Sequence, residues 1–208
     1  MMDAERKGAK ERLRGQVRRK TAALTEAYRR VAGTAICRQV EALETWRRSR
    51  VVFGFMSLPG EPDTRQLLLD ALASGKEVWL PRCEAGRRLA FLRVTDLGTL
   101  RPGTMGIREP EGEEEALPEA DLILVPCMAA APDGTRLGHG GGYYDRFLKG
   151  KTGLKVCLCF SECLAETLPV GENDVPVDCI VTEDAVLLTE ERCCSNMKPE
   201  RSEGGVPE

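Results

Sequence analysis

The sequence predicts an α/β fold, namely a single Rossmann-like domain of three layers in which helices cover both faces of a mostly parallel sheet. Two observations lead to this prediction. Short apolar runs alternate with segments of helical periodicity, and these runs are almost continuously apolar, as strands buried on both faces are. The length of 208 residues fits one domain. We expect it to span residues 1–190, and we expect the polar, aperiodic residues 191–208 to be a disordered tail.

Four segments have the features of helices. Two near the N-terminus show the apolar spacing of amphipathic helices. Their apolar members are Leu13, Val17, Leu24 and Tyr28 in the first, and Ile36, Val40, Leu43 and Trp46 in the second. A third helix is expected over residues 64–73, with Gly75 as its C-terminal stop. The fourth is expected over residues 143–148, directly after a glycine-rich loop.

The apolar runs are rich in strand-forming residues and predict the sheet. The clearest buried strand covers residues 121–126, which read Asp-Leu-Ile-Leu-Val-Pro. Further strands are expected over residues 50–57, 76–81, 89–94, 154–160 and 179–182. Because helical segments separate most of these runs, parallel neighbours connected by crossovers are favoured.

Composition argues against several classes of protein. The net charge of −3 gives no overall preference for nucleic acid. No apolar run approaches the roughly 20 residues of a membrane span, and the N-terminus lacks the apolar stretch of a signal peptide. The nine cysteines include no C-x-x-C pair, and Cys157 and Cys159 are expected on one face of a strand. We therefore expect buried, reduced thiols rather than disulfides or a metal site, and a cytoplasmic location.

The charge is unevenly distributed along the chain. Residues 1–20 carry eight basic side chains against three acidic ones, whereas residues 109–121 are strongly acidic. The basic helix could be an ordinary solvated surface or a docking site for phosphate groups. Binding of nucleic acid is disfavoured, because the chain is acidic overall and aromatic residues do not alternate with the basic ones.

Residues 134–145, Gly-Thr-Arg-Leu-Gly-His-Gly-Gly-Gly-Tyr-Tyr-Asp, carry the strongest functional signal. Glycines allow close approach to the backbone, and exposed amides before a helix attract anions. Arg136 adds a planar fork for phosphate oxygens, and Asp145 adds a hard oxygen ligand of the kind that Mg²⁺ prefers. The alternative is a flexible loop, but the flanking residues favour phosphate binding. The segment is neither a P-loop nor a dinucleotide-binding fingerprint.

The run from Arg136 to Leu148 resembles the signature of 5-formyltetrahydrofolate cyclo-ligases, also called methenyltetrahydrofolate synthetases. Other segments resemble motifs of this family, in the family's order. These are Lys10–Arg14, Leu58–Thr64, Pro81-Arg82, Gly106–Pro110, and Glu172–Asp174 with Asp178. The resemblance covers about residues 5–185 and therefore nearly all of the expected domain.

The resemblance implies an ATP-dependent ligase that cyclises 5-formyltetrahydrofolate to 5,10-methenyltetrahydrofolate and releases ADP and phosphate. It implies ATP and Mg²⁺ as cofactors, and neither nucleic acid nor membrane as a partner. The alternative is a ligase of the same fold that activates another formyl or carboxyl compound. Two departures from the family pattern favour this alternative: Pro126-Cys127 replaces Pro-Gly, and Ala130-Ala131 replaces Phe-Asp.

The resemblance also implies the roles of individual residues. Lys10, Arg14 and Arg136 would act in catalysis, and Asp145 and Asp174 would bind the metal. The ATP contacts would be Lys10, Glu11, Arg12, Leu13, Arg14, Arg82, Arg136, Leu137, Gly138, His139, Gly140, Gly141, Gly142, Tyr143 and Tyr144. The folate contacts would be Met56, Glu61, Gly140, Gly142 and Tyr143.

Two of these assignments can be examined by simple chemistry. Lys10 and Arg14 are four residues apart, hence about 6 Å along one face of a helix, whereas Arg12 points away from them. His139 is the only histidine of the chain. Acid–base catalysis by histidine would therefore depend on this one loop residue, and the alternative is that His139 is incidental.

Overall fold

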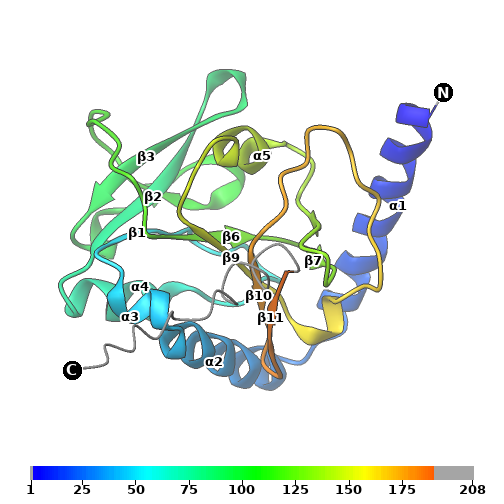
Figure 1. The fold of residues 1–208 in the computed structure, drawn as a ribbon, viewed down its shortest axis with the longest axis horizontal. Helices are drawn as coiled ribbons and strands as arrows, with labels where there is room; N and C mark the ends of the chain where they lie inside the picture. Colours follow the sequence, from blue (N-terminus) through cyan, green and yellow to red (C-terminus); the bar gives the residue numbers. More distant parts are fainter. Residues whose placement is uncertain (1, 190–208) are drawn as a thin grey trace, which may run out of the picture.

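The structure is a computed structural model that describes residues 2–189, and the tail expected at 191–208 lies outside them. The centre of the described part is a seven-stranded sheet in the order β11-β10-β9-β6-β1-β2-β3 (Figure 1). Its strands are β1 (Val51–Phe53), β2 (Glu77–Glu84), β3 (Arg88–Val94), β6 (Leu122–Pro126), β9 (Leu154–Leu158), β10 (Cys179–Val181) and β11 (Val186–Leu188).

The strand pairing confirms a mostly parallel sheet. The strands from β2 to β10 in this order are parallel to each other, and β3 and β11 are antiparallel strands at the two edges. In β6, the residues Leu122 to Val125 are completely buried. An uninterrupted apolar run is what a central parallel strand requires, because both of its faces are covered.

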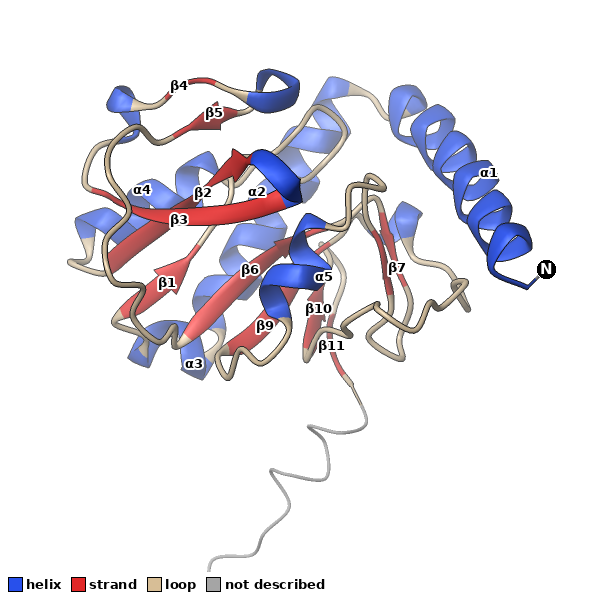
Figure 2. Cartoon of the chain, turned by 90° about the horizontal axis from the view of Figure 1, so that it is seen from above, coloured by secondary structure: helices blue, strands red, loops and turns tan. Residues whose placement is uncertain are grey.

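The helices cover both faces of the sheet, as predicted (Figures 1 and 2). Helices α2 (Glu26–Ala42), α3 (Glu44–Arg48) and α4 (Arg65–Ala73) lie on one face, and α5 (Tyr143–Leu148) lies on the other. Helix α1 (Met2–Ala23) stands to the side of the sheet. Within residues 2–189, no helix is both long enough and apolar enough to cross a membrane.

The boundary between the first two helices differs from the one expected. Helix α2 begins after Thr25, whose hydroxyl oxygen accepts a hydrogen bond of 3.1 Å from the backbone N–H of Tyr28. Tyr28 therefore belongs to α2 and not to the first helix. Leu43 separates α2 from α3, so the second expected helix is in fact two. The N-cap at Thr25 marks the start of a new helix, and the spacing of apolar residues alone does not reveal this boundary.

Several short elements were not predicted. They are the hairpins β4 (Arg101–Pro102) with β5 (Arg108–Glu109) and β7 (Ala129–Ala130) with β8 (Arg136–Leu137), the edge strand β11, and four 3₁₀ turns at Ala85–Arg87, Leu97–Thr99, Thr104–Gly106 and Ser161–Cys163. Strands of two residues are too short to show a period. The strand expected over residues 50–57 is also shorter, and beyond it the carbonyl oxygen of Phe55 accepts a hydrogen bond of 2.5 Å from Thr64 Oγ1.

Three of the few aromatic side chains fix α5 on the sheet. Phe91 of β3 lies between Phe53 of β1 and Phe147 of α5, with ring centroids 5.0 Å and 4.2 Å apart. Stacked aromatic pairs add to the stabilisation from buried area. The start of α5, which carries Tyr143, Tyr144 and Asp145, is therefore held in a defined position.

All seven cysteines of the described residues are unpaired, and six of them are buried. Cys157 lies in β9 and Cys159 directly follows it. Burial raises the pKa of the Cys179 thiol to about 12 and that of the Cys37 thiol to about 11. These thiols stay protonated and unreactive in the folded protein.

Candidate active site

A cavity of about 290 Å³ opens where strands β1, β2 and β6 end. Ligands of open α/β sheets bind outside the carboxyl ends of the strands. The cavity wall combines charged and apolar side chains from many segments, namely α1, the turn after β1, β3, the β4–β5 hairpin, β8, α5 and the segment before β10. Its charged members are Lys10, Arg14, Glu61, Glu109, Arg136, Asp145 and Asp174, and its larger apolar members are Phe55, Met56, Leu58, Leu89, Met105 and Ile107.

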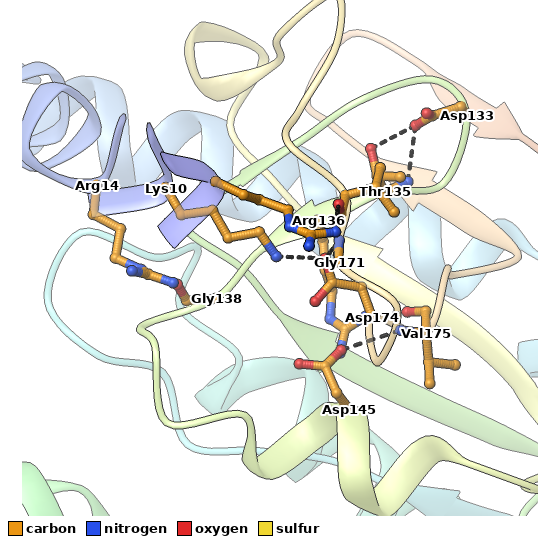
Figure 3. Close-up of polar contacts among 12 residues, drawn as sticks. Lys10, Arg14, Asp133, Thr135, Arg136, Gly138, Asp145, Gly171, Asp174 and Val175 are labelled. Carbon is orange, nitrogen blue, oxygen red and sulfur yellow. Dashed lines mark hydrogen bonds and ion pairs between the residues drawn. The ribbon is translucent and has the colours of Figure 1, made fainter. Parts of the chain in front are cut away.

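Helix α1 contributes two cations, which contact different parts of the wall (Figure 3). Lys10 Nζ forms an ion pair with Asp174. Arg14 Nε donates a hydrogen bond of 2.8 Å to the carbonyl oxygen of Gly138 in the glycine loop. Their side chains are 17% and 12% exposed, whereas Arg12 is exposed and lies outside the cavity. The four-residue spacing thus presents both cations to one site.

Arg136 is the most buried cation of the cavity, with a side chain only 4% exposed. Its Nη2 donates to Asp145 Oδ1 at 2.7 Å, and its Nη1 donates to the carbonyl oxygen of Val175. A guanidinium buried this deeply requires such partners, because an unpaired buried charge is costly. The two contacts fix the plane of the fork and leave further N–H groups for an anion in the cavity.

The two acids predicted to share a metal come from distant segments and are adjacent in the structure (Figure 3). The backbone N–H of Val175, the residue after Asp174, donates to Asp145 Oδ1 at 3.2 Å. Asp174 Oδ2 accepts from the N–H of Gly171 at 2.7 Å and pairs with Lys10. Contacts within the described residues thus engage one oxygen of each carboxylate, while both acids line the cavity.

The glycine loop crosses the cavity and requires glycine at specific positions. Gly140 and Gly142 have positive φ angles of 100° and 65°. A Cβ atom at Gly140 would lie 3.2 Å from Arg14 Cζ, and one at Gly142 would lie 2.9 Å from Arg146 Nη1. Larger residues would therefore strain the backbone and displace the cation that holds the loop against α1.

Nearly the whole described chain is similar to known proteins. The sequence model of the 5-formyltetrahydrofolate cyclo-ligase family matches residues 6–183. This chain belongs to that family.

Individual relatives match over most of their length. The chain is 32% identical over 204 residues to the 5-formyltetrahydrofolate cyclo-ligase of Saccharomyces cerevisiae, which covers 86% of this chain and 97% of the relative. The mouse enzyme of the same name is 30% identical over 192 residues, with 85% and 95% covered.

Solved structures agree in fold. The 5,10-methenyltetrahydrofolate synthetase of Aquifex aeolicus superposes with a TM-score of 0.78 at 37% identity, covering 87% of this chain and 93% of that one. The synthetase of Mycoplasma pneumoniae, at 21% identity and a TM-score of 0.66, covers 84% of this chain and 98% of its own and supports the fold alone.

Both departures from the family pattern are buried, one between β6 and β7 and the other at the β7–β8 hairpin. Ala130 and Ala131 are completely buried, and Ala131 N–H bonds to the carbonyl oxygen of Thr135 at 2.9 Å. Ala130 also pairs with Arg136 across β7 and β8. Cys127 is 3% exposed, and its Sγ donates to the carbonyl oxygen of Leu158 at 3.4 Å. Backbone pairing of β7 with β8 thus positions Arg136 opposite Ala130.

His139 contacts Glu61 across the cavity, which the sequence did not indicate. Its Nε2 lies 2.8 Å from Glu61 Oε1, and the N–H of Leu58 donates to Glu61 Oε2 at 2.8 Å. The Glu61 side chain is 5% exposed. His139 thus links the glycine loop to the turn after β1. No linear signal relates two residues 78 positions apart.

Sequence reasoning missed cavity residues from β2 and from the β4–β5 hairpin. Cys83 lines the wall, and burial together with the neighbouring Glu109 raises the pKa of its thiol to about 11. Glu109 is 8% exposed and accepts a hydrogen bond of 3.1 Å from the N–H of Thr104. Met105 is 67% exposed at the cavity and has a positive φ of 57°. The Gly106–Pro110 motif indicated this segment but no particular side chain.

Four predicted ATP contacts lie outside the cavity. Arg82 lies in β2 between Pro81 and Cys83, which face the cavity. Because alternate side chains of a strand point to opposite faces, Arg82 points away from the cavity, and it pairs with Glu84 at 2.7 Å. Glu11 and Arg12 are exposed on α1, and Leu13 packs against the core. The remaining predicted residues all line the cavity: Lys10, Arg14, Met56, Glu61, Arg136, Leu137, Gly138, His139, Gly140, Gly141, Gly142, Tyr143, Tyr144, Asp145 and Asp174.

Proposed function

We propose that this protein is a 5-formyltetrahydrofolate cyclo-ligase, which uses ATP to convert 5-formyltetrahydrofolate to 5,10-methenyltetrahydrofolate with release of ADP and phosphate. One observation carries the proposal: the family's motifs, scattered from residue 10 to residue 174, converge on one cavity. This cavity offers cations for a triphosphate and an apolar wall for a ring system.

The reaction requires no nucleophile from the protein. The formyl oxygen of the substrate attacks the γ-phosphorus of ATP and displaces ADP, which leaves a phosphorylated imidate-like intermediate. The neighbouring nitrogen of the folate then bonds to the activated carbon, gives up its proton and expels phosphate together with the former formyl oxygen. Phosphoryl transfer of this kind depends mainly on positioning and on neutralising charge.

Three cations of the cavity supply the charge and the positioning. Arg136 presents a fixed planar fork, because Asp145 and the carbonyl oxygen of Val175 orient it. Lys10 and Arg14 reach the cavity from α1, and Arg14 also holds the glycine loop through Gly138. Charge-assisted hydrogen bonds from such groups to phosphate oxygens are the strong ones in proteins.

Asp145 and Asp174 fit a magnesium ion that accompanies ATP. Each has one oxygen engaged with the protein, and the other is available in the same cavity. The described residues contain no group of three metal-ligating side chains, so phosphate oxygens and water would complete the coordination shell. Magnesium commonly binds through one or two carboxylates in this manner. Bound there, it would neutralise phosphate charge.

The test is a spectroscopic assay of the purified protein. With 5-formyltetrahydrofolate and Mg-ATP, we expect absorbance of the methenyl product in the near ultraviolet, and none without ATP. A panel of other formyl and carboxyl compounds, followed by ADP release, examines the same-fold ligase as the alternative. ATP use with one of those compounds and none with 5-formyltetrahydrofolate would refute the proposal.

A further inference from the structure

The hydroxyl oxygen of Tyr144 is an anomaly among the described residues. It is the only buried side-chain nitrogen or oxygen atom there that has no hydrogen-bond partner. Buried polar groups are almost always paired, because burial without a partner destabilises the folded protein. An unpaired group of this kind at a cavity wall suggests that a ligand completes it.

The position of this phenol is firmly set. Tyr144 is the second residue of α5, and the stacking of Phe147 on Phe91 fixes that helix on the sheet. Its side chain lines the cavity together with Glu61 and Cys83. Its hydroxyl group can donate one hydrogen bond.

We infer that Tyr144 is a specificity-determining residue for the folate, whose hydroxyl donates a hydrogen bond to an acceptor oxygen of the substrate's ring system. The inference rests on the proposed function. It assigns Tyr144 to the folate, whereas the family resemblance implied a contact with ATP.

The surroundings of the phenol favour a heterocycle over a phosphate. Glu61, whose carboxylate side chain is only 5% exposed, lines the same cavity as Tyr144. A carboxylate repels phosphate oxygens but accepts hydrogen bonds from ring N–H groups. A reduced pterin presents a ring N–H beside a ring carbonyl. The pair of Glu61 as acceptor and Tyr144 as donor complements such an edge.

Less than 1 Å² of the Tyr144 hydroxyl oxygen is accessible to solvent. A ligand can therefore contact this oxygen only after a small adjustment of the cavity wall. Two methionines, Met56 and Met105, line the same cavity. Unbranched thioether side chains repack easily around ligands. The cavity therefore contains adaptable side chains beside the fixed phenol.

Tyr144→Phe is the decisive variant, and Tyr28→Phe is its matched control. Tyr28 is a half-buried tyrosine, but its hydroxyl is paired with Glu183 and it lies outside the cavity. Without ligand, Tyr144→Phe should melt at the same temperature as the wild type or higher, because it removes an unpaired group. Tyr28→Phe should melt at a lower temperature, because it breaks a pair.

Calorimetric titration with 5-formyltetrahydrofolate and, separately, with Mg-ATP completes the test. Tyr144→Phe should weaken folate binding at least about tenfold and leave ATP binding unchanged, since one buried hydrogen bond to the ligand is lost. Tyr28→Phe should bind both ligands as the wild type does.

The remaining outcomes each overturn the inference. Unchanged folate affinity in Tyr144→Phe would mean that the ring only fills space. A loss confined to ATP would restore the nucleotide assignment. Failure of the wild-type protein itself to bind 5-formyltetrahydrofolate would refute the proposed function together with the inference, which distinguishes it from the other two results.

Discussion

Lys10 and Arg14 illustrate how far single residues can be assigned from spacing. Their separation by one helical turn predicted a shared face, and the structure places both in the cavity and leaves Arg12 exposed. The spacing did not predict that Glu11 and Leu13, two further residues of the same motif, lie outside the cavity. The contact of His139 with Glu61 could not be predicted either, because it depends on how two distant loops meet.

The basic helix provides a prediction with an internal control. Lys10→Ala and Arg14→Ala should each raise the Michaelis constant for ATP or lower turnover, by about ten- to a hundredfold, since a lost charge-assisted contact is worth roughly 1.5–3 kcal/mol. Arg12→Ala should be nearly neutral, because isolated exposed charges contribute little. Each of the three substitutions removes one positive charge, so the change in net charge is the same in all three variants. Equal small effects in steady-state kinetics would mean that the helix face is merely solvated.

Asp145 provides the second residue-scale prediction. Asp145→Asn should lower activity sharply, and a higher magnesium concentration should restore part of it, because one hard anionic ligand is lost. Asp133→Asn is the control, since Asp133 only accepts hydrogen bonds from Thr135 in an exposed turn. Magnesium titrations of both variants provide the comparison. An Asp145→Asn protein with wild-type turnover and magnesium dependence is incompatible with the assignment.

At the scale of elements, one acidic residue joins three segments of the fold. Glu183, after β10, accepts hydrogen bonds from Tyr28 of α2 and from the N–H and hydroxyl of Ser161, at 3.0 Å and 2.7 Å from the last two. Gln39 of α2 donates to the carbonyl oxygen of Glu183 at 3.0 Å. Burial opposes ionisation of Glu183, but hydrogen bonds from the side chains of Tyr28 and Ser161 and from backbone N–H groups outweigh it and lower the pKa of its carboxyl group.

This junction predicts a pH-dependent loss of stability. Glu183→Gln should reduce the free energy of unfolding by about 1–3 kcal/mol at pH 7, because hydrogen bonds to a charged acceptor are replaced by weaker ones. A lowered pKa in the folded state means that the contribution is complete above the ordinary value of 4.5 and disappears as the pH falls through the folded value. Denaturant unfolding of both proteins from pH 7 to pH 3 should therefore show a shrinking difference. A constant difference would contradict the role of ionised Glu183.

The long elements were predictable and the short ones were not. Apolar runs such as Leu122–Val125 identify central parallel strands from composition alone. The hairpins β4–β5 and β7–β8 have strands of two residues, which are too short to show an alternating pattern in the sequence. These hairpins belong to segments that line the cavity. The catalytic end of the sheet is therefore less predictable than its core.

At the scale of the whole molecule, the fold buries its thiols at very different depths. Cys157 and Cys179 are completely buried, whereas Cys83 is half-buried at the cavity wall. Among the described cysteines, Cys83 should react fastest with N-ethylmaleimide, and 5-formyltetrahydrofolate should slow that reaction. Mass spectrometry of labelled peptides measures both effects. Intramolecular disulfides among these cysteines, or equal labelling of Cys157, would contradict the reduced and packed core.

In the proposed reaction, the γ-phosphoryl group of ATP activates the formyl oxygen of the substrate. The most direct measurement uses 5-formyltetrahydrofolate labelled with ¹⁸O in the formyl group, incubated with the purified protein and Mg-ATP. We predict that each phosphate released with the methenyl product carries one ¹⁸O atom, which shifts its ³¹P resonance. Methenyl product formed together with unlabelled phosphate would contradict the proposed phosphoryl transfer.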